Sequence, residues 1–327
     1  MKTSISVIIP NYNGRHLLEM YLPTVIDALR VADVPNELII VDDQSKDDSI
    51  DFIRRMYPDI LLLVNEKNSG FSFTCNQGIK IAQMELTLLL NSDVKLTSDY
   101  FEKQWKYFEK TDTFGVMGRI MSKDGQKIED AARILFFKGC RIKANRFYYS
   151  NDPTEQVYTA YLSGANALIN TKKLKELKGF DEIYSPFTSE DYDLSIRAWL
   201  IGWKCYYEHH SICYHQVSGS IRKNLQSNFI KQIYFRNRFI FNGIHLTKVK
   251  ALIWPMHLFL LEILPRVLTG KLWIFQSFRD YRWNFNNIRD SKIKLNKLKL
   301  DHKSTLEIED IIQLINGSLK GKSIVRF

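Results

Sequence analysis

The sequence lacks several patterns that would mark common classes of protein. Its four cysteines form no C-x-x-C pair, so we expect reduced structural thiols of a cytosolic protein. Cys205, His209, His210 and Cys213 lie near one another, but their spacing fits no common zinc module, which disfavours a zinc site. There is no internal repeat or low-complexity segment, and an apolar content of 45% excludes wholesale disorder.

Long hydrophobic runs and nucleic-acid-binding motifs are also missing. The most apolar tract, residues 251–261, has about half of the ~20 residues that a membrane-spanning helix needs. The N-terminus offers no secretory signal. No G-x-G-x-x-G follows the first apolar segment, which excludes an NAD-dependent oxidoreductase of that type. Because we find no helix-turn-helix, zinc finger or RNA-binding aromatic motif, we expect no nucleic acid partner.

Charge is distributed unevenly along the chain. Residues 1–225 contain 28 Lys or Arg and 29 Asp or Glu, a net charge of −1. Residues 226–327 contain 18 Lys or Arg and only 7 Asp or Glu, a net charge of +11. The sequence therefore predicts a domain over 1–225 and a basic, aromatic-rich helical region over 226–327, with different roles.

The first hundred residues alternate between strand and helix patterns. A capping box at Ser45-Lys46-Asp47-Asp48 predicts the start of a helix that runs to about Met56. The predicted strands are 5–10, 37–43, 60–64 and 86–91, and the other predicted helices are 15–32 and 73–83. Short apolar strands that alternate with helices indicate an α/β fold, mainly a parallel sheet with helices on both faces.

The pattern changes after about residue 114. We expect strands at 114–121 and 203–208 and paired strands within 134–149. The predicted helices here cover 171–177 and 189–202. Beyond 225 the chain is expected to be helical, with Pro255 and Pro265 breaking its longest apolar tract.

Polar residues follow each of the first four predicted strands. The sequences at these ends are PNYN (10–13), DDQS (42–45), NEKNSG (65–70) and NSD (91–93). In open α/β sheets the ligand site lies outside the carboxyl ends of the strands. Four polar ends together, two of them acidic, therefore predict a ligand site at this edge.

The residue types at these positions suggest a reaction. Asp93 at a strand end, with a distant His215, could hold Mn²⁺ or Mg²⁺, which would neutralise a diphosphate. Asp191, at the start of a helix, could accept a proton from an attacking hydroxyl. Together these groups suggest displacement of a nucleoside diphosphate from an activated sugar.

Seven segments, in this order, resemble the family 2 glycosyltransferases, which have the nucleotide-sugar-binding GT-A fold. They are SVIIPNYN (6–13), IIVDDQSKDDS (39–49), NSGFSFTCNQG (68–78), LLNSDV (89–94), SGANALI (163–169), GFDEIYSPFTSEDYDLSIRAWLIG (179–202) and YHQVSGS (214–220). The resemblance implies a GT-A-type nucleotide-diphospho-sugar transferase fold over about residues 4–222, followed by a helical C-terminal extension. It covers about two thirds of the chain.

The resemblance also implies nucleotide-binding residues. They are Pro10, Tyr12, Asp42, Asn68, Gly70, Asn91 and Ser92. Pro10 and Tyr12 would border the nucleobase, and Asp42 would hydrogen-bond the base or the ribose. Asn68 and Gly70 would begin a loop that closes over the nucleotide.

Other matching positions imply the chemistry of transfer. Asp191 would be the general base, Asp93 the metal ligand, and His215 would reach the metal or the diphosphate. The residues that would line the sugar or acceptor cleft are Gly164, Ala165 and Glu190. The implied function is inverting, metal-dependent transfer of one sugar to a hydroxyl acceptor, in cell-surface polysaccharide or glycolipid assembly.

The sequence departs from the family pattern at two points. Asn91 replaces the first acid of the D-x-D motif, which removes one negative charge and lowers the expected metal affinity. The Q-x-x-R-W motif of processive members is absent, which favours transfer of a single sugar.

Several of these residues also have simpler interpretations. Asp43 is best explained as a solvated turn residue, and Asp93 could be one too. Acids at 190, 191 and 193 would suit any helix N-terminus, and Asp193 could pair with Arg197 four residues on. His215 could be a core histidine.

The basic tail leaves two interpretations open. Its mixture of basic, aromatic and apolar residues suits an anionic membrane surface, which would place the protein peripherally on the inner face of the cell membrane. The acceptor could be a saccharide or a lipid-linked molecule, and membrane attachment would favour the lipid-linked one. Alternatively, the tail only packs on the first domain. Two other functions remain as alternatives: a catalytically inactive nucleotide-sugar-binding protein of the same fold, or nucleic-acid binding through the tail.

Overall fold

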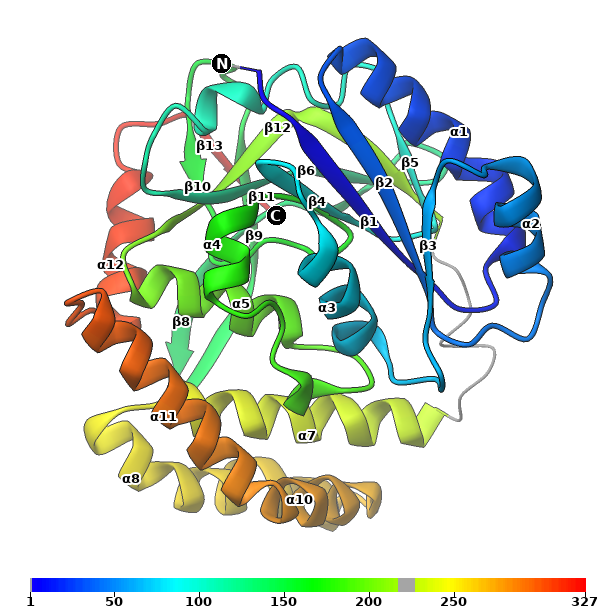
Figure 1. Ribbon diagram of the computed structural model, residues 1–327. Coiled ribbons are helices and arrows are strands. Elements are labelled where there is room, and N and C mark those ends of the chain that lie inside the picture. Colours follow the sequence, from blue (N-terminus) through cyan, green and yellow to red (C-terminus); the bar gives the residue numbers. More distant parts are fainter. Residues whose placement is uncertain (1, 217–226) are drawn as a thin grey trace.

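A large central sheet organises the molecule. The computed structural model describes residues 2–216 and 227–327. Within these residues a 10-stranded sheet has the order β10-β12-β6-β11-β4-β1-β2-β3, with β5 beside β12 and β7 beside β6 (Figure 1). Its strands are β1 (Ile5–Asn11), β2 (Asn36–Asp42), β3 (Leu61–Val64), β4 (Leu86–Leu90), β5 (Val94–Leu96), β6 (Thr113–Ser122), β7 (Ile128–Asp130), β10 (Val157–Tyr158), β11 (Asn166–Asn170) and β12 (Lys204–His215).

Helices cover both faces of this sheet. They are α1 (Arg15–Ala32), α2 (Ser49–Met56), α3 (Phe71–Ile81), α4 (Thr171–Glu176) and α5 (Glu190–Leu200), with the short 3₁₀ turns η1 (Trp105–Tyr107) and η2 (Glu182–Tyr184). Alternate residues of β1 serve opposite faces, because side chains in a strand alternate. Val7 and Ile9 belong to one apolar cluster with Leu22 of α1, and Ile8 belongs to the other with Ile79 of α3.

The strands β1, β2, β3 and β4 are parallel, so their carboxyl ends lie at one edge. β12 runs parallel to β6, whereas β11 is antiparallel to both β4 and β6. The predicted α/β class with a largely parallel sheet and C-terminal helices is confirmed. The predicted paired strands are β8 (Ala132–Lys138) and β9 (Arg141–Ser150), which form a second, three-stranded sheet with the C-terminal β13 (Ile324–Arg326).

The C-terminal helices stack below the sheet and return to it. Figure 1 shows α7 lying between the α/β part of the chain and a layer that contains α8 and α10. The bounds are α7 (Ser227–His245), α8 (Lys248–His257), the π-helical η3 (Leu258–Ile263), α9 (Leu264–Leu268), α10 (Trp273–Trp283), α11 (Phe285–Asp301) and α12 (Ile308–Ser318). Phe239 and Trp254 share one apolar cluster with Leu194 of α5. The predicted boundary between residues 225 and 226 lies outside the described residues, and the division there stays a prediction.

The predicted start of the second helix is wrong. Helix α2 begins at Ser49, so Ser45 is not a helix cap. Instead the buried carboxylate of Asp42 engages Ser45, accepting from its backbone N–H at 2.7 Å and from its hydroxyl at 2.6 Å. Ser45 therefore serves the end of β2, whereas Asp47 accepts from the backbone N–H of Ser49 at 3.1 Å at the start of α2.

Proline does not break the apolar tract of the C-terminal region. The backbone stays helical over Lys248–Leu268, 21 residues that by length and composition could cross a membrane. Pro255 lies inside α8, and Pro265 follows the π-helical segment at the start of α9. The wider hydrogen bonding of that segment accommodates a residue without an N–H. The expectation of a tract only half as long as a membrane span is therefore corrected.

Candidate active site

The ends of β1 and β2 are joined by side-chain hydrogen bonds. The amide of Asn11 donates to Asp42 at 2.8 Å and to the hydroxyl of Ser45 at 3.2 Å. Asp42 is fully buried, so its carboxylate holds this turn together, and its predicted contact with the nucleotide stays a prediction. Pro10 is half-buried and Tyr12 is 40% exposed, which leaves the Tyr12 ring accessible to a nucleobase.

Asp43 organises the loop after β3. It is buried, and its carboxylate accepts hydrogen bonds from the backbone N–H of Ser69 at 2.9 Å and of Gly70 at 2.8 Å, and from the Asn65 amide at 2.8 Å. The interpretation of Asp43 as a solvated turn residue is wrong. Asp42, the last residue of β2, and the next residue Asp43 thus bind different segments of the chain, because successive side chains point to opposite sides.

Gly70 allows this loop to pass close to another segment. Its φ is +86°, and a Cβ there would lie 2.9 Å from the backbone of Pro186. The backbone N–H of Phe71 donates to the Pro186 carbonyl at 3.1 Å. The exposed Asn68 and half-buried Gly70 therefore belong to a loop that is pinned to the segment preceding α5.

The end of β4 lies against β11 and β12. The backbone N–H of Asn91 donates to the Ala165 carbonyl at 3.3 Å, and Asn91 and Ser92 are half-buried. Asp93 is 6% exposed, and its Oδ1 lies 3.4 Å from Nε2 of His215. Asp93 and His215, 122 residues apart, thus share one small site, as the sequence suggested.

His215 also contacts Glu129, which the sequence analysis did not identify. Its Nδ1 lies 2.9 Å from a carboxylate oxygen of Glu129. Burial lowers the pKa of His215, but its hydrogen bonds to Asp93 and Glu129 outweigh this and raise the pKa to about 9. A carboxylate on one imidazole nitrogen orients the other nitrogen, an arrangement common around metal ligands.

The donor set fits a cation that is shared with a substrate. Within residues 2–216 and 227–327, no three His, Cys, Asp or Glu side chains are grouped to hold a metal unaided. Asp93 supplies a carboxylate, and His215 would supply an imidazole after the cation displaces the proton that its raised pKa favours. This pair suits Mn²⁺ or Mg²⁺ completed by diphosphate oxygens and water. The cysteines are buried and free.

Asp191 lies in the first turn of α5, next to the β11 side of this edge. Its carboxylate accepts from the backbone N–H of Tyr192 at 2.8 Å. Burial is the main effect and raises the pKa of Asp191 to about 6, while the positive charge of Arg133 lowers it. A carboxyl with this pKa is a competent base near neutral pH.

The segment before β11 links the first turns of α5 to the end of β4. The Leu162 N–H donates to the Ser195 hydroxyl of α5 at 2.9 Å, and the Ala165 carbonyl accepts from Asn91, two residues before Asp93. A Cβ at the buried Gly164 would meet the Phe71 ring at 3.1 Å, so this segment is closely packed. The structure therefore brings the three predicted groups to the same edge of the sheet.

Glu190 is the buried neighbour of Asp191. It is 6% exposed, and its Oε2 has no hydrogen-bond partner among the described residues. Burial, with a contribution from Asp191, raises the pKa of Glu190 to about 8. A protonated carboxyl there could donate a hydrogen bond, and the predicted place of Glu190 in the sugar or acceptor cleft stays a prediction.

Asp193 forms buried ion pairs that hold the fold together. It pairs with Arg197 at 2.7 Å, as predicted, and with Nε2 of His245 on α7 at 2.8 Å. Arg197 also donates to the carbonyls of Leu177 and Gly179, each at 2.8 Å. This buried network fixes α5 and α7 relative to each other.

Asn237 is a second contact that sequence reasoning missed. This fully buried α7 residue donates from Nδ2 to the carbonyls of Tyr184 at 2.6 Å, Phe187 at 2.8 Å and Thr188 at 2.9 Å. Thr188 and Ser189 both have positive φ values, +74° and +75°, which are unfavourable for non-glycine residues. Asn237 thus stabilises a strained turn directly before Glu190 and Asp191. Nothing in the sequence pattern around Asn237 indicates this role, because the residue lies in a helix of ordinary basic and aromatic composition.

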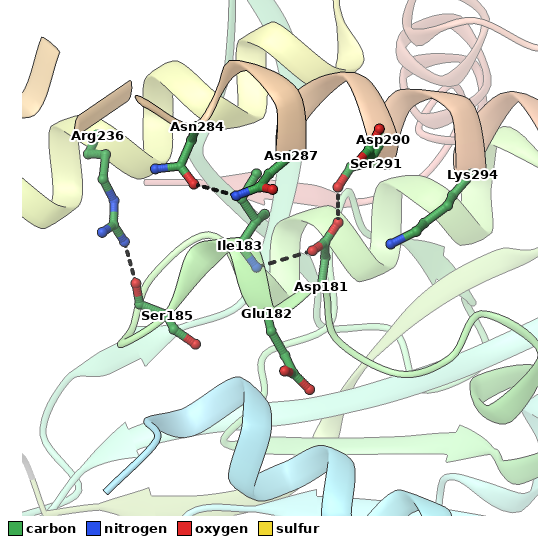
Figure 2. Close-up of a pocket in the computed structure, with 10 residues that line it drawn as sticks. All are labelled: Asp181, Glu182, Ile183, Ser185, Arg236, Asn284, Asn287, Asp290, Ser291 and Lys294. Atoms are coloured by element: carbon green, nitrogen blue, oxygen red, sulfur yellow. Dashed lines mark hydrogen bonds between the residues drawn. The ribbon is translucent and has the colours of Figure 1, made fainter. Parts of the chain in front are cut away.

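A polar cleft of about 450 Å³ lies behind the same segment. Figure 2 shows Arg236 reaching Ser185 from one side, while Asp181 bonds Ser291 of α11 and Glu182 points away toward α3. None of the predicted site residues lines it. This cleft is therefore a seam between the 181–185 segment and the C-terminal helices.

Replacing Asn237 with Leu should loosen the turn before Asp191. The carbonyls of Tyr184, Phe187 and Thr188 would lose their donor, which costs about 1–3 kcal/mol of stability for a buried acceptor. We expect a lower melting temperature and a turnover reduced more than substrate affinity. The exposed Asn145→Leu variant is the control, and equal turnover in both variants would contradict the positioning role.

Comparisons with known proteins identify the family and the fold. The model of the family described as Glycosyl transferase family 2 matches residues 6–178. One relative is TuaG of Bacillus subtilis, provisionally named a teichuronic acid biosynthesis glycosyltransferase. It is 32% identical over 134 residues, which cover 39% of this chain and 52% of TuaG. The poly(ribitol-phosphate) beta-glucosyltransferase of Bacillus spizizenii is 23% identical over 207 residues, 55% of this chain and 32% of its own. The chain thus spans about half or less of these relatives.

Solved structures share the fold. GalNAc-T7, solved with UDP, GalNAc and Mn²⁺, superposes with a TM-score of 0.66 at 14% identity, over 98% of this chain and 58% of that chain. TarS 1–349 of S. aureus in complex with UDP gives a TM-score of 0.52 at 15% identity, over 98% of this chain and 92% of that chain. The family match covers more than half of the sequence. The chain belongs to glycosyl transferase family 2.

Proposed function

We propose that the protein transfers a single sugar, with inversion, from a nucleotide-diphospho sugar to a hydroxyl acceptor in the assembly of a cell-surface polysaccharide. The observation that carries this is the placement of Asp93, His215 and Asp191 at one carboxyl edge of the sheet. Similar structures were solved in complex with UDP, UDP-GlcNAc and GDP-Man, which supports a nucleotide sugar as donor. The names of two relatives concern cell-wall polymers, which supports the acceptor class.

In the proposed reaction Asp191 takes the proton of the acceptor hydroxyl. The new bond joins the acceptor oxygen to the anomeric carbon, while the bond from that carbon to the diphosphate oxygen breaks on the opposite side. The electron pair of the broken bond leaves with the nucleoside diphosphate. The N–H group of Tyr192 holds the Asp191 carboxylate in place for the proton transfer.

The proposed cation would be held by Asp93 and His215 and would neutralise the diphosphate as negative charge develops. Glu129 orients His215 toward Asp93, so the imidazole presents Nε2 to the site. On the donor side, the loop held by Asp43 and the accessible Tyr12 ring would border the nucleotide.

The test is a screen of nucleotide sugars with added Mn²⁺ or Mg²⁺. Release of nucleoside diphosphate that increases with a saccharide or lipid-linked acceptor would support transfer, and the anomeric configuration of the product would test inversion. Binding of a nucleotide sugar with no release under any combination would instead support an inactive binding protein.

Replacing Asp93 with Ala should weaken Mn²⁺ binding in the presence of UDP by about 10–100-fold, because one of two side-chain ligands is lost. Titration calorimetry measures this without requiring turnover. The matched control is Asp99→Ala, an exposed acid that follows β5. Unchanged Mn²⁺ affinity in the Asp93 variant would refute the metal assignment.

A further inference from the structure

The C-terminal region exposes a row of large apolar side chains along one helix. Leu252 is 82% exposed, Leu268 77%, and Met256 and Leu261 60% each. Spacings of three and four residues place such side chains on one side of a helix. This apolar face comprises Val249, Leu252, Ile253, Met256, Phe259, Leu260, Leu261, Leu264 and Leu268, and the exposed Leu272 and Phe275 follow it in the chain.

The opposite side of the same helix is fixed to the protein. Trp254 and Ile263 are 3% exposed, and the Trp254 indole N–H donates to the Tyr281 hydroxyl at 3.3 Å. Glu262 is buried and forms ion pairs with Arg141 of β9 and with Arg266. A helix attached along one side in this way cannot be surrounded by lipid, so it lies along a surface rather than across a bilayer.

Charge favours an anionic occupant of this face over a second copy of the chain. Residues 226–327 have a net charge of +11. Four exposed basic residues lie on this helix, on α10 or in the connection between them: Lys248, Lys271, Arg279 and Arg282. Self-association would place these like charges opposite one another, whereas an anionic bilayer attracts each of them by about 1 kcal/mol.

The apolar face lies close to the candidate active site in the fold. In Figure 1, α7 separates the α8 and α10 layer from the α/β part of the chain. The Ser277 hydroxyl of α10 donates to the Gln232 carbonyl of α7 at 3.0 Å, and Asn237 of α7 holds the turn before Asp191. One helix therefore separates the exposed apolar residues from that turn.

We propose that the apolar face lies in the interface of an anionic phospholipid bilayer, with its helix parallel to the membrane plane. Leucine, methionine and phenylalanine side chains enter the boundary between headgroups and acyl chains, and the flanking lysines and arginines contact lipid phosphates. This proposal stands independently of the proposed reaction, since it rests on exposure, attachment and charge.

The test is flotation of the full chain with vesicles. We expect binding to vesicles of phosphatidylcholine mixed with phosphatidylglycerol, and at least about tenfold weaker binding to phosphatidylcholine alone. The Leu252→Glu/Leu268→Glu variant should lower the partition coefficient at least about tenfold, because two exposed side chains no longer insert. The control is Val31→Glu/Met56→Glu, which changes exposed apolar residues of α1 and α2 and should bind as the wild type does.

A charge variant tests whether the basic residues contribute to binding of anionic vesicles. Lys271→Glu/Arg279→Glu/Arg282→Glu should lose binding to anionic vesicles while retaining the wild-type circular dichroism spectrum. The proposal is overturned if the wild type binds no better than the leucine variant, or if it prefers neither vesicle. It is also overturned if sedimentation without lipid shows a wild-type dimer that the leucine variant dissociates, since the occupant would then be a second copy.

Discussion

Replacing Asp191 with Asn should lower the rate of sugar transfer by about 10²–10⁴-fold while the protein remains folded. The amide has almost the same shape, and its oxygen can still accept from the N–H group of Tyr192. It cannot take a proton from the acceptor hydroxyl. Steady-state release of nucleoside diphosphate measures the effect, and a folded variant with normal turnover would refute the assignment of the base.

The pH profile provides the control for this variant. Burial raises the pKa of Asp191 to about 6, so the wild-type rate should increase as pH rises through about 6 and the carboxylate loses its proton. The residual rate of the Asn variant should lack that rise. If both proteins show the same dependence, another group controls the step.

Replacing Asp193 with Ala should lower the free energy of unfolding by about 3–5 kcal/mol, because Arg197 and His245 would remain buried without their shared carboxylate. Urea unfolding followed by circular dichroism measures the loss. The double variant Asp193→Ala/Arg197→Ala should be less destabilised than the sum of the two single changes, since it leaves no unpaired guanidinium. A loss below about 1 kcal/mol in the single variant would show that the network contributes little.

The sign of the accompanying pH effect follows from the same network. Burial alone would raise the pKa of Asp193, but Arg197 and His245 lower it to about 2. A carboxyl whose pKa is depressed on folding contributes its stability above its unfolded value, about 3.9. That contribution should disappear as pH falls toward about 2, and the Ala variant should lack this part of the acid unfolding curve.

Local patterns in the sequence predicted much of the sheet and the position of the site. Apolar runs predicted β1 to β4 within one or two residues. Parallel strands that are buried on both sides, such as β1 and β4, are nearly continuous in apolar residues. The edge strand β3 is also an apolar run, although its end residues Leu61 and Val64 are exposed. The polar ends of these four strands then located the edge where Asp93 lies. These features depend on short stretches of chain and on a general property of parallel sheets.

The remaining contacts depend on tertiary structure that no local pattern specifies. Asp43 looked like a turn residue, but its burial follows from the path of the loop over Ser69 and Gly70. Glu129 and Asn237 reach the site from a short β-strand and a distant helix, respectively. Predicting them would require the relative placement of elements that are far apart in sequence.

The bonds from α7 to α5 and to the turn before it have a practical consequence for dissecting the molecule. A fragment ending at residue 216 would lose both His245, which pairs with Asp193, and Asn237, which donates to the Thr188 carbonyl. It would also uncover the apolar contacts that Phe239 and Ile240 make in the shared cluster. We expect such a fragment to form a loosely packed, dye-binding and aggregating state instead of a smaller working enzyme.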